Sequence, residues 1–237
     1  GGSLITNKRQ PRTAREKVIK RLSEEIALAL RENPGLRLVL GHGSGSFGHV
    51  SAKKHGTREG VQSPQEWEGF VEVWRDASTL HRIVIKALQS ANVPAITFAA
   101  SGSITASKGK ITTWDITPLC TALENKLVPV VYGDVVFDQE WGGTILSTEN
   151  LFNHLAHQLI PRRILLAGYE DGVWADYPTR ETLITKITPY QLSTIKEALE
   201  GSSATDVTGG MASKVEEMLE LATNVEGLEI SIFSGTK

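Results

Sequence analysis

The residues most suggestive of chemistry form a glycine-rich segment that ends in a histidine, Gly43-Ser44-Gly45-Ser46-Phe47-Gly48-His49. Closely spaced glycines allow several backbone N–H groups to converge on one anion, and a helix that begins there adds the positive end of its dipole. A histidine at the end of such a segment can donate a hydrogen bond to phosphate oxygens. The segment therefore predicts a phosphate-binding loop in which His49 is functional, whereas His42 and His55 receive no such assignment.

The same segment satisfies the G-x-G-x-x-G pattern of dinucleotide-binding proteins. That interpretation requires a strand ending in Asp or Glu about 20 residues further on. The interval instead contains Ser63-Pro64 and the start of a helix. The pattern therefore favours a phosphate site of another kind.

Four other short segments could also bind phosphate: Gly133-Asp134, Asp171-Gly172, Gly209-Gly210 and Gly1-Gly2-Ser3. Lys214 follows Gly210 by one helical turn and could reach the same anion as the glycine N–H groups. Each segment alone could be an ordinary turn, and Lys214 could be a solvated side chain. Together the segments indicate a polyphosphate ligand and a second phosphate.

Sequence patterns of several other enzyme classes are absent. The chain has no G-x-x-x-x-G-K-[ST] loop, no protein-kinase H-R-D or D-F-G set, no H-E-x-x-H and no G-x-S-x-G elbow. Its one cysteine, Cys120, has no Cys or His neighbour at metal-ligand spacing. A hydrolase, a P-loop enzyme and a metal site built from protein ligands are therefore not expected.

Composition limits the class of partner. The chain has 237 residues, 40% of them hydrophobic, and a net charge of −2 with dispersed basic residues. This argues against a nucleic-acid or anionic-membrane surface, and no run approaches the roughly 18 apolar residues of a spanning helix. We expect a cytoplasmic protein with a small-molecule partner. Because the chain starts at Gly1 without a methionine and stops after an apolar run, we also expect both termini to be trimmed.

Short apolar runs alternate with longer segments of helical period, which predicts β-α-β units, an α/β fold and a mainly parallel sheet. The expected strands are residues 36–40, 93–99, 127–132, 164–168 and 228–233. The expected helices are residues 13–31, 64–90, 115–125, 150–159, 189–200 and 210–224. Residues 102–114 and 135–148, rich in Gly, Ser and Thr, are expected to form loops or hairpins.

The helix expected at 64–90 has a clear start signal, because Ser63 can cap it, Pro64 suits its first position and Glu66 completes a capping box. It also carries an aromatic and aliphatic stripe: Trp67, Phe70, Val71, Trp74, Leu80, Val84 and Leu88. The stripe is interpreted either as core packing or as the wall of a ligand pocket.

Five segments resemble, in order, the motifs of the isopentenyl phosphate kinases, which belong to the amino acid kinase superfamily. These segments are residues 1–8, 42–49, 133–138, 171–173, and 206–211 together with Lys214. The motifs at the two ends identify the superfamily, whereas Ser46-Phe47-Gly48-His49 is more specific and is shared chiefly with fosfomycin kinases. The resemblance covers nearly the whole chain.

The resemblance implies a single amino acid kinase domain over residues 1–237, a three-layer α/β/α sandwich with a mainly parallel central sheet, assembled as a homodimer. The N-terminal part would hold the acceptor phosphate, and the part from about residue 160 would hold the nucleotide. The implied reaction converts isopentenyl phosphate and MgATP to isopentenyl diphosphate and ADP. ATP and Mg²⁺ are thus the expected cofactors.

The resemblance also implies residue roles. His49 would hold the acceptor phosphate, and Lys8 and Lys214 would be the catalytic lysines, with Lys8 on the transferring phosphoryl group. The ATP site would comprise Gly1, Gly2, Ser3, Gly45, Asp171, Gly172, Gly209, Gly210 and Lys214. The acceptor site would comprise Gly43, Ser44, Gly48, His49, Gly133, Asp134 and Asn150.

Such a reaction needs no general base, because a phosphomonoester with a second pKa of about 6 is already an anionic nucleophile at neutral pH. Positioning and charge stabilisation dominate phosphoryl transfer, and lysines, a histidine, Mg²⁺ and N–H groups supply both. An alcohol acceptor would instead require a base such as Asp, for which the sequence offers no clear candidate; Asp134 is the one residue left open.

Two positions depart from the family pattern. Ser147-Thr148-Glu149-Asn150 stands where many members have Ser-Gly-Asp-Asp, so Glu149 would replace an Asp that orders the lysines, or activity would be reduced. Ser44 replaces a glycine, and a positive φ there would cost about 1 kcal/mol. A fosfomycin-type or other phosphate or phosphonate kinase, and a catalytically weak nucleotide-binding sensor, are the alternative functions.

Overall fold

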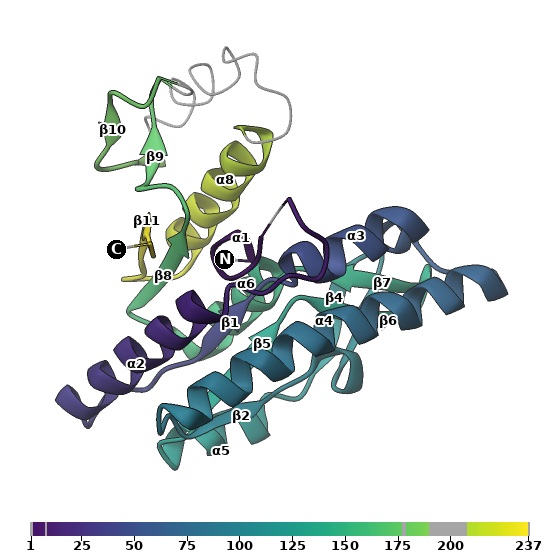
Figure 1. The fold of residues 1–237 in the computed structure, drawn as a ribbon, viewed down its shortest axis with the longest axis horizontal. Coiled ribbons are helices and arrows are strands. Elements are labelled where there is room, and N and C mark those ends of the chain that lie inside the picture. Colours follow the sequence, from purple (N-terminus) through teal and green to yellow (C-terminus); the bar gives the residue numbers. More distant parts are fainter. Residues whose placement is uncertain (1, 8, 177–178, 190–207, 237) are drawn as a thin grey trace. The chain divides into compact units, whose positions relative to one another are not determined.

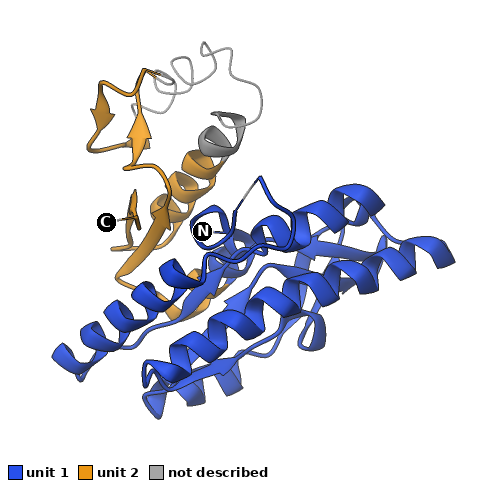
Figure 2. Cartoon of the chain, viewed as in Figure 1, with its two compact units in different colours: residues 1–154 blue, residues 155–237 orange. Residues whose placement is uncertain are grey.

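The structure is a computed structural model that describes residues 2–7, 9–176, 179–189 and 208–236, with only the backbone for residues 208–213. The chain divides into two compact units, residues 1–154 and 155–237, and each is described by itself (Figure 2). Within the described ranges, no helix is both long and apolar enough to cross a membrane.

Unit 1 contains most of the helices (Figure 1). They are α1 (Gly2–Ile5), α2 (Glu16–Glu32), α3 (Gly45–His55), α4 (Pro64–Ser90) and α5 (Thr117–Glu124), with the 3-10 turns η1 (Thr57–Glu59) and η2 (Ala100–Gly102). The boundary between the units falls within α6 (Thr148–Leu159).

The first sheet of unit 1 is parallel and has the order β1-β5-β2. β5 (Val128–Tyr132) lies between β1 (Leu40–His42) and β2 (Ala95–Thr97), and all five of its residues are buried, as in the central strand of a sheet covered on both faces. Ala27 of α2 and Leu88 of α4 share one hydrophobic cluster with Val128 and Val130. This core fixes the ends of the strands, where the glycine-rich segment begins.

The second sheet of unit 1 has the order β4-β3-β6-β7 and is built from two hairpins. β3 (Ile104–Ser107) pairs antiparallel with β4 (Lys110–Trp114), and β6 (Asp134–Asp138) pairs antiparallel with β7 (Gly142–Leu146). A parallel pairing of β3 with β6 joins the hairpins. The two segments expected to be loops or hairpins are therefore hairpins.

Asp138 organises the turns of both hairpins. Its buried carboxylate accepts backbone N–H bonds from Lys108 (3.1 Å), Gly109 (2.8 Å), Glu140 (3.0 Å) and Trp141 (2.9 Å). Burial by itself raises the pKa of Asp138, but the four donors outweigh it and hold the pKa below its ordinary value. One side chain thus satisfies the turn N–H groups of two hairpins.

Unit 2 has its own parallel strand pair and helix. β8 (Arg163–Gly168) pairs with β11 (Glu229–Ser234), and β9 (Val173–Trp174) pairs antiparallel with β10 (Leu183–Ile184). α8 (Thr208–Asn224) buries Val215, Met218 and Leu221 at helical spacing. These elements follow the β-α-β pattern expected from the sequence.

The α/β fold class is confirmed, and most elements lie close to their expected positions. The helix expected at 64–90 has those bounds in the structure, and its capping box is formed: Ser63 Oγ accepts from Glu66 N at 3.3 Å, and Glu66 Oε2 accepts from Ser63 N at 2.7 Å. The helices expected at 13–31, 115–125 and 210–224 correspond to α2, α5 and α8 with small shifts at their ends.

Three expectations need correction or fall outside the description. The strand expected at 36–40 begins only at Leu40, because Leu36 N donates to Asn33 O in the turn that follows α2. The helix expected to start at Asn150 starts at Thr148. Of the helix expected at 189–200, residues 190–200 lie outside the described residues.

We predict that Asp138→Asn lowers the free energy of unfolding by about 2 kcal/mol, because an amide NH₂ must then face at least one turn N–H group. Urea denaturation monitored by circular dichroism measures the change. Glu140→Gln on the same hairpin is the matched control and should leave the midpoint nearly unchanged, since Glu140 is exposed at the surface. Equal stability of the two variants would contradict the role of Asp138.

Candidate active site

The glycine-rich segment forms the junction between β1 and α3. Gly43 and Ser44 follow the end of β1, and residues from Gly45 onward already belong to α3. Gly45 has a φ of +50°, whereas Ser44 has a φ of −72° and a ψ of −12°. The positive φ falls on Gly45 and not on Ser44, so the strain that a positive φ would cause at Ser44 is absent.

The N-terminal segment crosses this junction at very short range. A Cβ on Gly2 would lie 2.7 Å from Gly45 N, and a Cβ on Gly45 would lie 2.8 Å from Gly2 O, so side chains are excluded on both sides. Thr6 joins the segments, since its buried hydroxyl donates to Gly2 O (2.7 Å) and accepts from Ser46 N (3.0 Å). Gly2, Ser3 and the glycine-rich segment, predicted separately to bind phosphate, thus lie together; Gly1 and Lys8 are outside the described residues.

The start of α3 is suited to an anion. Its N-cap residue, Ser44, makes no side-chain capping bond, so no side chain covers the positive end of the helix dipole. Ser46 N and Phe47 N are already bonded, to Thr6 Oγ1 and to Ser44 O. The hydroxyl of Ser46 is buried and has no hydrogen-bond partner among the described atoms. A buried hydroxyl is normally satisfied, which makes Ser46 a candidate ligand-binding residue that sequence reasoning missed. Its position within the glycine-rich segment was the available signal.

His49 lies in α3 one residue beyond Gly48, and its side chain is exposed. Gly48 packs closely, because a Cβ there would meet Ser44 Oγ and lie 3.9 Å from Ala77 Cβ of α4. The close packing of Gly48 fixes the turn of α3 that carries His49 relative to α4. The histidine thus has the accessibility that a substrate-binding residue requires.

The start of α3 is also connected to α4 by charged side chains. Arg12 N donates to Ser46 O (3.1 Å), and the Arg12 guanidinium binds both carboxylate oxygens of Asp76 at 2.9 Å. Glu72, the second acceptor for Arg12, also accepts from Lys54 (2.9 Å) and His55 (2.7 Å). The hydrogen bonds from His55 and then from Lys54 lower the pKa of Glu72 to about 2. Asp76 is buried, whereas Glu72 is partly exposed. The Arg12 clamp, which consists of the bonds from Arg12 to Ser46 O and Asp76, connects the N-terminal segment to α4.

Gly133 and Asn150 lie near the carboxyl end of β1. Gly133 N donates to His42 O (3.1 Å), and so does the hydroxyl of Thr148 (2.7 Å), the first residue of α6. Asn150 Oδ1 accepts from Ser147 N (2.9 Å) and Ser147 Oγ (2.8 Å), which caps α6. The end of β1, the residue after β5 and the start of α6 therefore meet at the carbonyl of His42.

Asp134 is the first residue of β6. It is 1% exposed, and its carboxylate accepts from Ser101 N (3.4 Å) and Val135 N (2.9 Å). Burial raises the pKa of Asp134. The side chain thus connects η2 to β6, and its place in the acceptor site stays a prediction.

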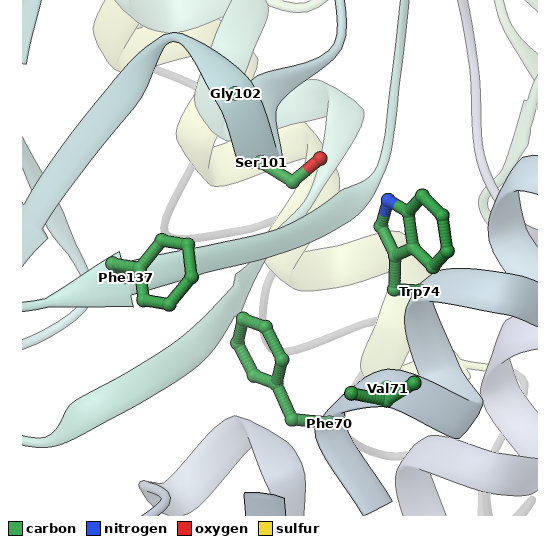
Figure 3. Close-up of a pocket in the computed structure, with 6 residues that line it drawn as sticks. All are labelled: Phe70, Val71, Trp74, Ser101, Gly102 and Phe137. Atoms are coloured by element: carbon green, nitrogen blue, oxygen red, sulfur yellow. The ribbon is translucent and has the colours of Figure 1, made fainter. Parts of the chain in front are cut away.

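A hollow of about 250 Å³ opens between α4, η2 and β6 (Figure 3). Its walls are mainly apolar: Phe70, Val71, Trp74, Phe137, Ser101 and Gly102. The core-packing interpretation of the α4 stripe is confirmed for Phe70, Leu80 and Leu88, which are buried, whereas Trp74 is 44% exposed at the hollow. The interpretation of the stripe as a ligand wall stays a prediction. Phe70 also belongs to the hydrophobic cluster of Val61, Val73 and Val135.

Unit 2 carries the second part of the residues predicted to bind nucleotide. Asp171 is exposed after the end of β8, and Gly172 is buried, where a Cβ would lie 3.0 Å from Leu183 Cδ1. α8 begins at Thr208, so the N–H groups of Gly209 and Gly210 lie in its first turn, which has no intrahelical acceptors. Lys214 lies one turn further along α8 and is half-buried. This helix start is the second anion-compatible terminus in the chain.

No group of three His, Cys, Asp or Glu side chains suited to hold a metal ion occurs among the residues whose positions are described. Mg²⁺ commonly binds through substrate phosphates and one or two carboxylates.

Two buried histidines, His42 at the end of β1 and His81 of α4, lie next to the junction between β1 and α3. His42 and His81 are 7% and 4% exposed, and their rings bond each other at 3.0 Å. Burial lowers the pKa of His42 to about 4 and that of His81 to about 3. Both are therefore neutral in the folded protein near pH 7.

Comparison with known proteins agrees with this geometry. The profile of the amino acid kinase family matches residues 1–234. The chain is 32% identical to isopentenyl phosphate kinase of Methanothermobacter thermautotrophicus, over 99% of this chain and 88% of that protein. It is 33% identical to isopentenyl phosphate kinase of Methanocaldococcus jannaschii, over 91% of this chain and 83% of the relative. An X-ray structure of isopentenyl phosphate kinase superposes with a TM-score of 0.80 at 28% identity, covering 100% of this chain and 90% of the other.

The α/β fold, with a glycine-rich junction between β1 and α3 and a family profile that matches nearly the whole chain, is that of a phosphotransferase of the amino acid kinase class. The chain belongs to the amino acid kinase family. Its relatives at more than 30% identity place it with the isopentenyl phosphate kinases.

We predict that the folded protein loses stability as the pH falls from about 6.5 towards 5. In this pH range the unfolded chain takes up protons on His42 and His81, whereas the folded protein does not. Each histidine therefore lowers the free energy of unfolding by about 1.4 kcal/mol for each pH unit of decrease. Above pH 6.5 this contribution is complete and constant. Urea midpoints measured across this range should show a slope that is about halved in His81→Asn. A flat profile for the unmodified protein would contradict the prediction.

Proposed function

We propose that this protein transfers the γ-phosphoryl group of ATP to isopentenyl phosphate, giving isopentenyl diphosphate and ADP. The observation that carries the proposal is the crossing of Gly2 and Gly45 at the start of α3, beside the buried, unpartnered hydroxyl of Ser46. Two glycine segments in such close contact allow an acceptor phosphate and the end of a polyphosphate to approach each other. The relatives named isopentenyl phosphate kinase support the choice of acceptor.

The residue roles are part of the proposal. The acceptor phosphate binds at Gly43, Ser44, Gly48 and His49, with Gly133 and Asn150 nearby. The ATP phosphates bind at Gly1, Gly2, Ser3 and Gly45 and, in unit 2, at Asp171, Gly172, Gly209, Gly210 and Lys214. Lys8 stabilises the transferring phosphoryl group. Ser46, through its hydroxyl, is an addition that the structure suggests.

The chemistry follows from the charges. The acceptor oxygen is already anionic, so these residues need to overcome the repulsion between two phosphates and align them rather than remove a proton. His49 and the N–H groups of α3 orient the acceptor, while Lys8 and Lys214 balance charge on the transferred group. Mg²⁺, when bound with ATP, would supply further neutralisation of phosphate charge.

The hollow along α4 supports a prenyl acceptor over a small polar one. Ala77 of α4 lies beside Gly48, and Trp74 of the hollow precedes Ala77 by about one helical turn. α4 therefore connects the phosphate site to an apolar surface. A fosfomycin-type kinase is the second candidate, since it shares the His49 motif, but a small phosphonate would not use this surface.

We extend the proposal to the setting that the family resemblance implies, a homodimer in the cytoplasm. The expected partners remain ATP and the isoprenoid phosphate, without nucleic acid or membrane.

The function is tested with a panel of acceptors and MgATP, with ADP release as the measurement. We expect turnover with isopentenyl phosphate and little or none with fosfomycin, because the apolar wall stabilises a hydrocarbon tail. Turnover with fosfomycin but not with isopentenyl phosphate would transfer the protein to the second candidate function. ATP binding without turnover of any acceptor would favour a nucleotide-binding sensor.

We predict that His49→Ala lowers kcat with isopentenyl phosphate by at least about tenfold while ATP binding changes little, because the histidine acts on the acceptor side. Steady-state kinetics and calorimetric titration with ATP measure the two effects. Lys53→Ala removes an exposed charge from the same helix and should keep the kinetics of the parent. Unchanged kinetics in His49→Ala would remove His49 from the acceptor site.

A further inference from the structure

A chain of hydrogen bonds runs from the exposed side chain of Thr97 through two buried histidines to the first glycine of the proposed phosphate site. Thr97 Oγ1 at the end of β2 lies 2.8 Å from His81 Nε2 of α4. His81 Nδ1 lies 3.0 Å from His42 Nε2, and His42 Nδ1 lies 3.2 Å from the carbonyl oxygen of Gly43. The chain thus connects β2 and α4 to the junction between β1 and α3.

The protons on this chain have one consistent arrangement when both rings are neutral. The Gly43 carbonyl can only accept, so His42 Nδ1 must carry the proton and His42 Nε2 must be the acceptor. His81 Nδ1 must then donate to His42, which leaves His81 Nε2 as the acceptor for the Thr97 hydroxyl. Both histidines are therefore Nδ1–H tautomers, although the Nε2–H form is the more common one in water.

The surroundings favour the neutral rings that this arrangement requires. The His81 ring stacks on Tyr132 with centroids 4.0 Å apart and lies 5.3 Å from the His42 ring. Burial lowers the pKa of both histidines, to about 4 for His42 and about 3 for His81. A charged ring would replace an acceptor by a second donor and break the sequence of bonds.

This chain of hydrogen bonds matters to the proposed site because it fixes the orientation of the peptide between Gly43 and Ser44. The His42 carbonyl accepts from Gly133 N (3.1 Å) and from the Thr148 hydroxyl (2.7 Å), which orients the peptide between His42 and Gly43. The bond from His42 Nδ1 to the Gly43 carbonyl orients the next peptide. Because N–H and C=O point in opposite directions in a trans peptide, the N–H groups of Gly43 and Ser44 are directed away from the donors that bond to the two carbonyls.

We propose that His81 is a positioning residue of the phosphate site: it holds His42 as the Nδ1–H tautomer, and His42 thereby fixes the peptide that presents Ser44 N–H. This inference rests on the proposed function, which uses Gly43 and Ser44 to bind the acceptor phosphate. His81 itself touches no ligand. Its effect is transmitted through the carbonyl of Gly43.

The first test is independent of activity. Nitrogen-15 NMR of the histidine rings in the unmodified protein distinguishes a protonated from a bare ring nitrogen. We expect His42 and His81 both to show a protonated Nδ1 and a bare Nε2 near pH 7. An Nε2–H form of His42 would overturn the inference even if the protein is an active kinase.

Three substitutions of His81 form a matched kinetic test. An Asn side chain can place an N–H donor where His81 Nδ1 lies, a Gln side chain can replace Nε2 instead, and Leu replaces neither. We expect His81→Asn to keep kcat/KM for isopentenyl phosphate within about threefold, and His81→Gln and His81→Leu to lower it at least about tenfold. The NMR spectrum of His42 should retain the Nδ1–H form in His81→Asn and lose it in the other two.

Urea midpoints separate this effect from loss of structure. If Asn and Gln variants of equal stability are equally active, His81 has no positioning role and the inference fails. If the unmodified protein shows the Nδ1–H tautomer but no turnover of isopentenyl phosphate, the proposed function fails while the tautomer assignment stands.

Discussion

The contact between Gly2 and Gly45 is the constraint on which the arrangement of unit 1 depends. Two backbones can approach this closely only when neither residue has a side chain, and the Thr6 hydroxyl then bonds to both segments. The contact determines where α3 starts and which N–H groups it presents. The Arg12 clamp to Asp76 holds the same N-terminal segment against α4.

A second set of constraints comes from the parallel sheet below. His42 pairs with Tyr132 in the register of β1 and β5, so both strands end at one edge, and the residues that follow them meet there. Gly133 and Thr148 bond to the His42 carbonyl, and His81 bonds to its ring. The proposed phosphate site therefore lies on buried hydrogen bonds, which are costly to leave unsatisfied and so resist displacement.

Some of the site could be predicted because its signals are local. The glycine spacing from Gly43 to Gly48, the capping box at Ser63 and the start of α8 near Gly209 each depend on residues close in sequence. The roles of His81 and Asp134 could not be predicted in this way. His81 is one of several polar residues on a long helix, and its function depends on Thr97 and His42, which approach it only through tertiary packing.

The α/β class, most of the helices and strands and several phosphate-compatible glycine segments could be predicted from the sequence, because they follow from hydrophobic period and backbone freedom. Which of these segments meet depends on the tertiary structure. It showed that the positive φ belongs to Gly45 rather than Ser44, that Asp134 is buried and that Ser46 has an unpartnered hydroxyl among the described atoms. Those properties depend on contacts between residues far apart in the chain, which no local pattern encodes.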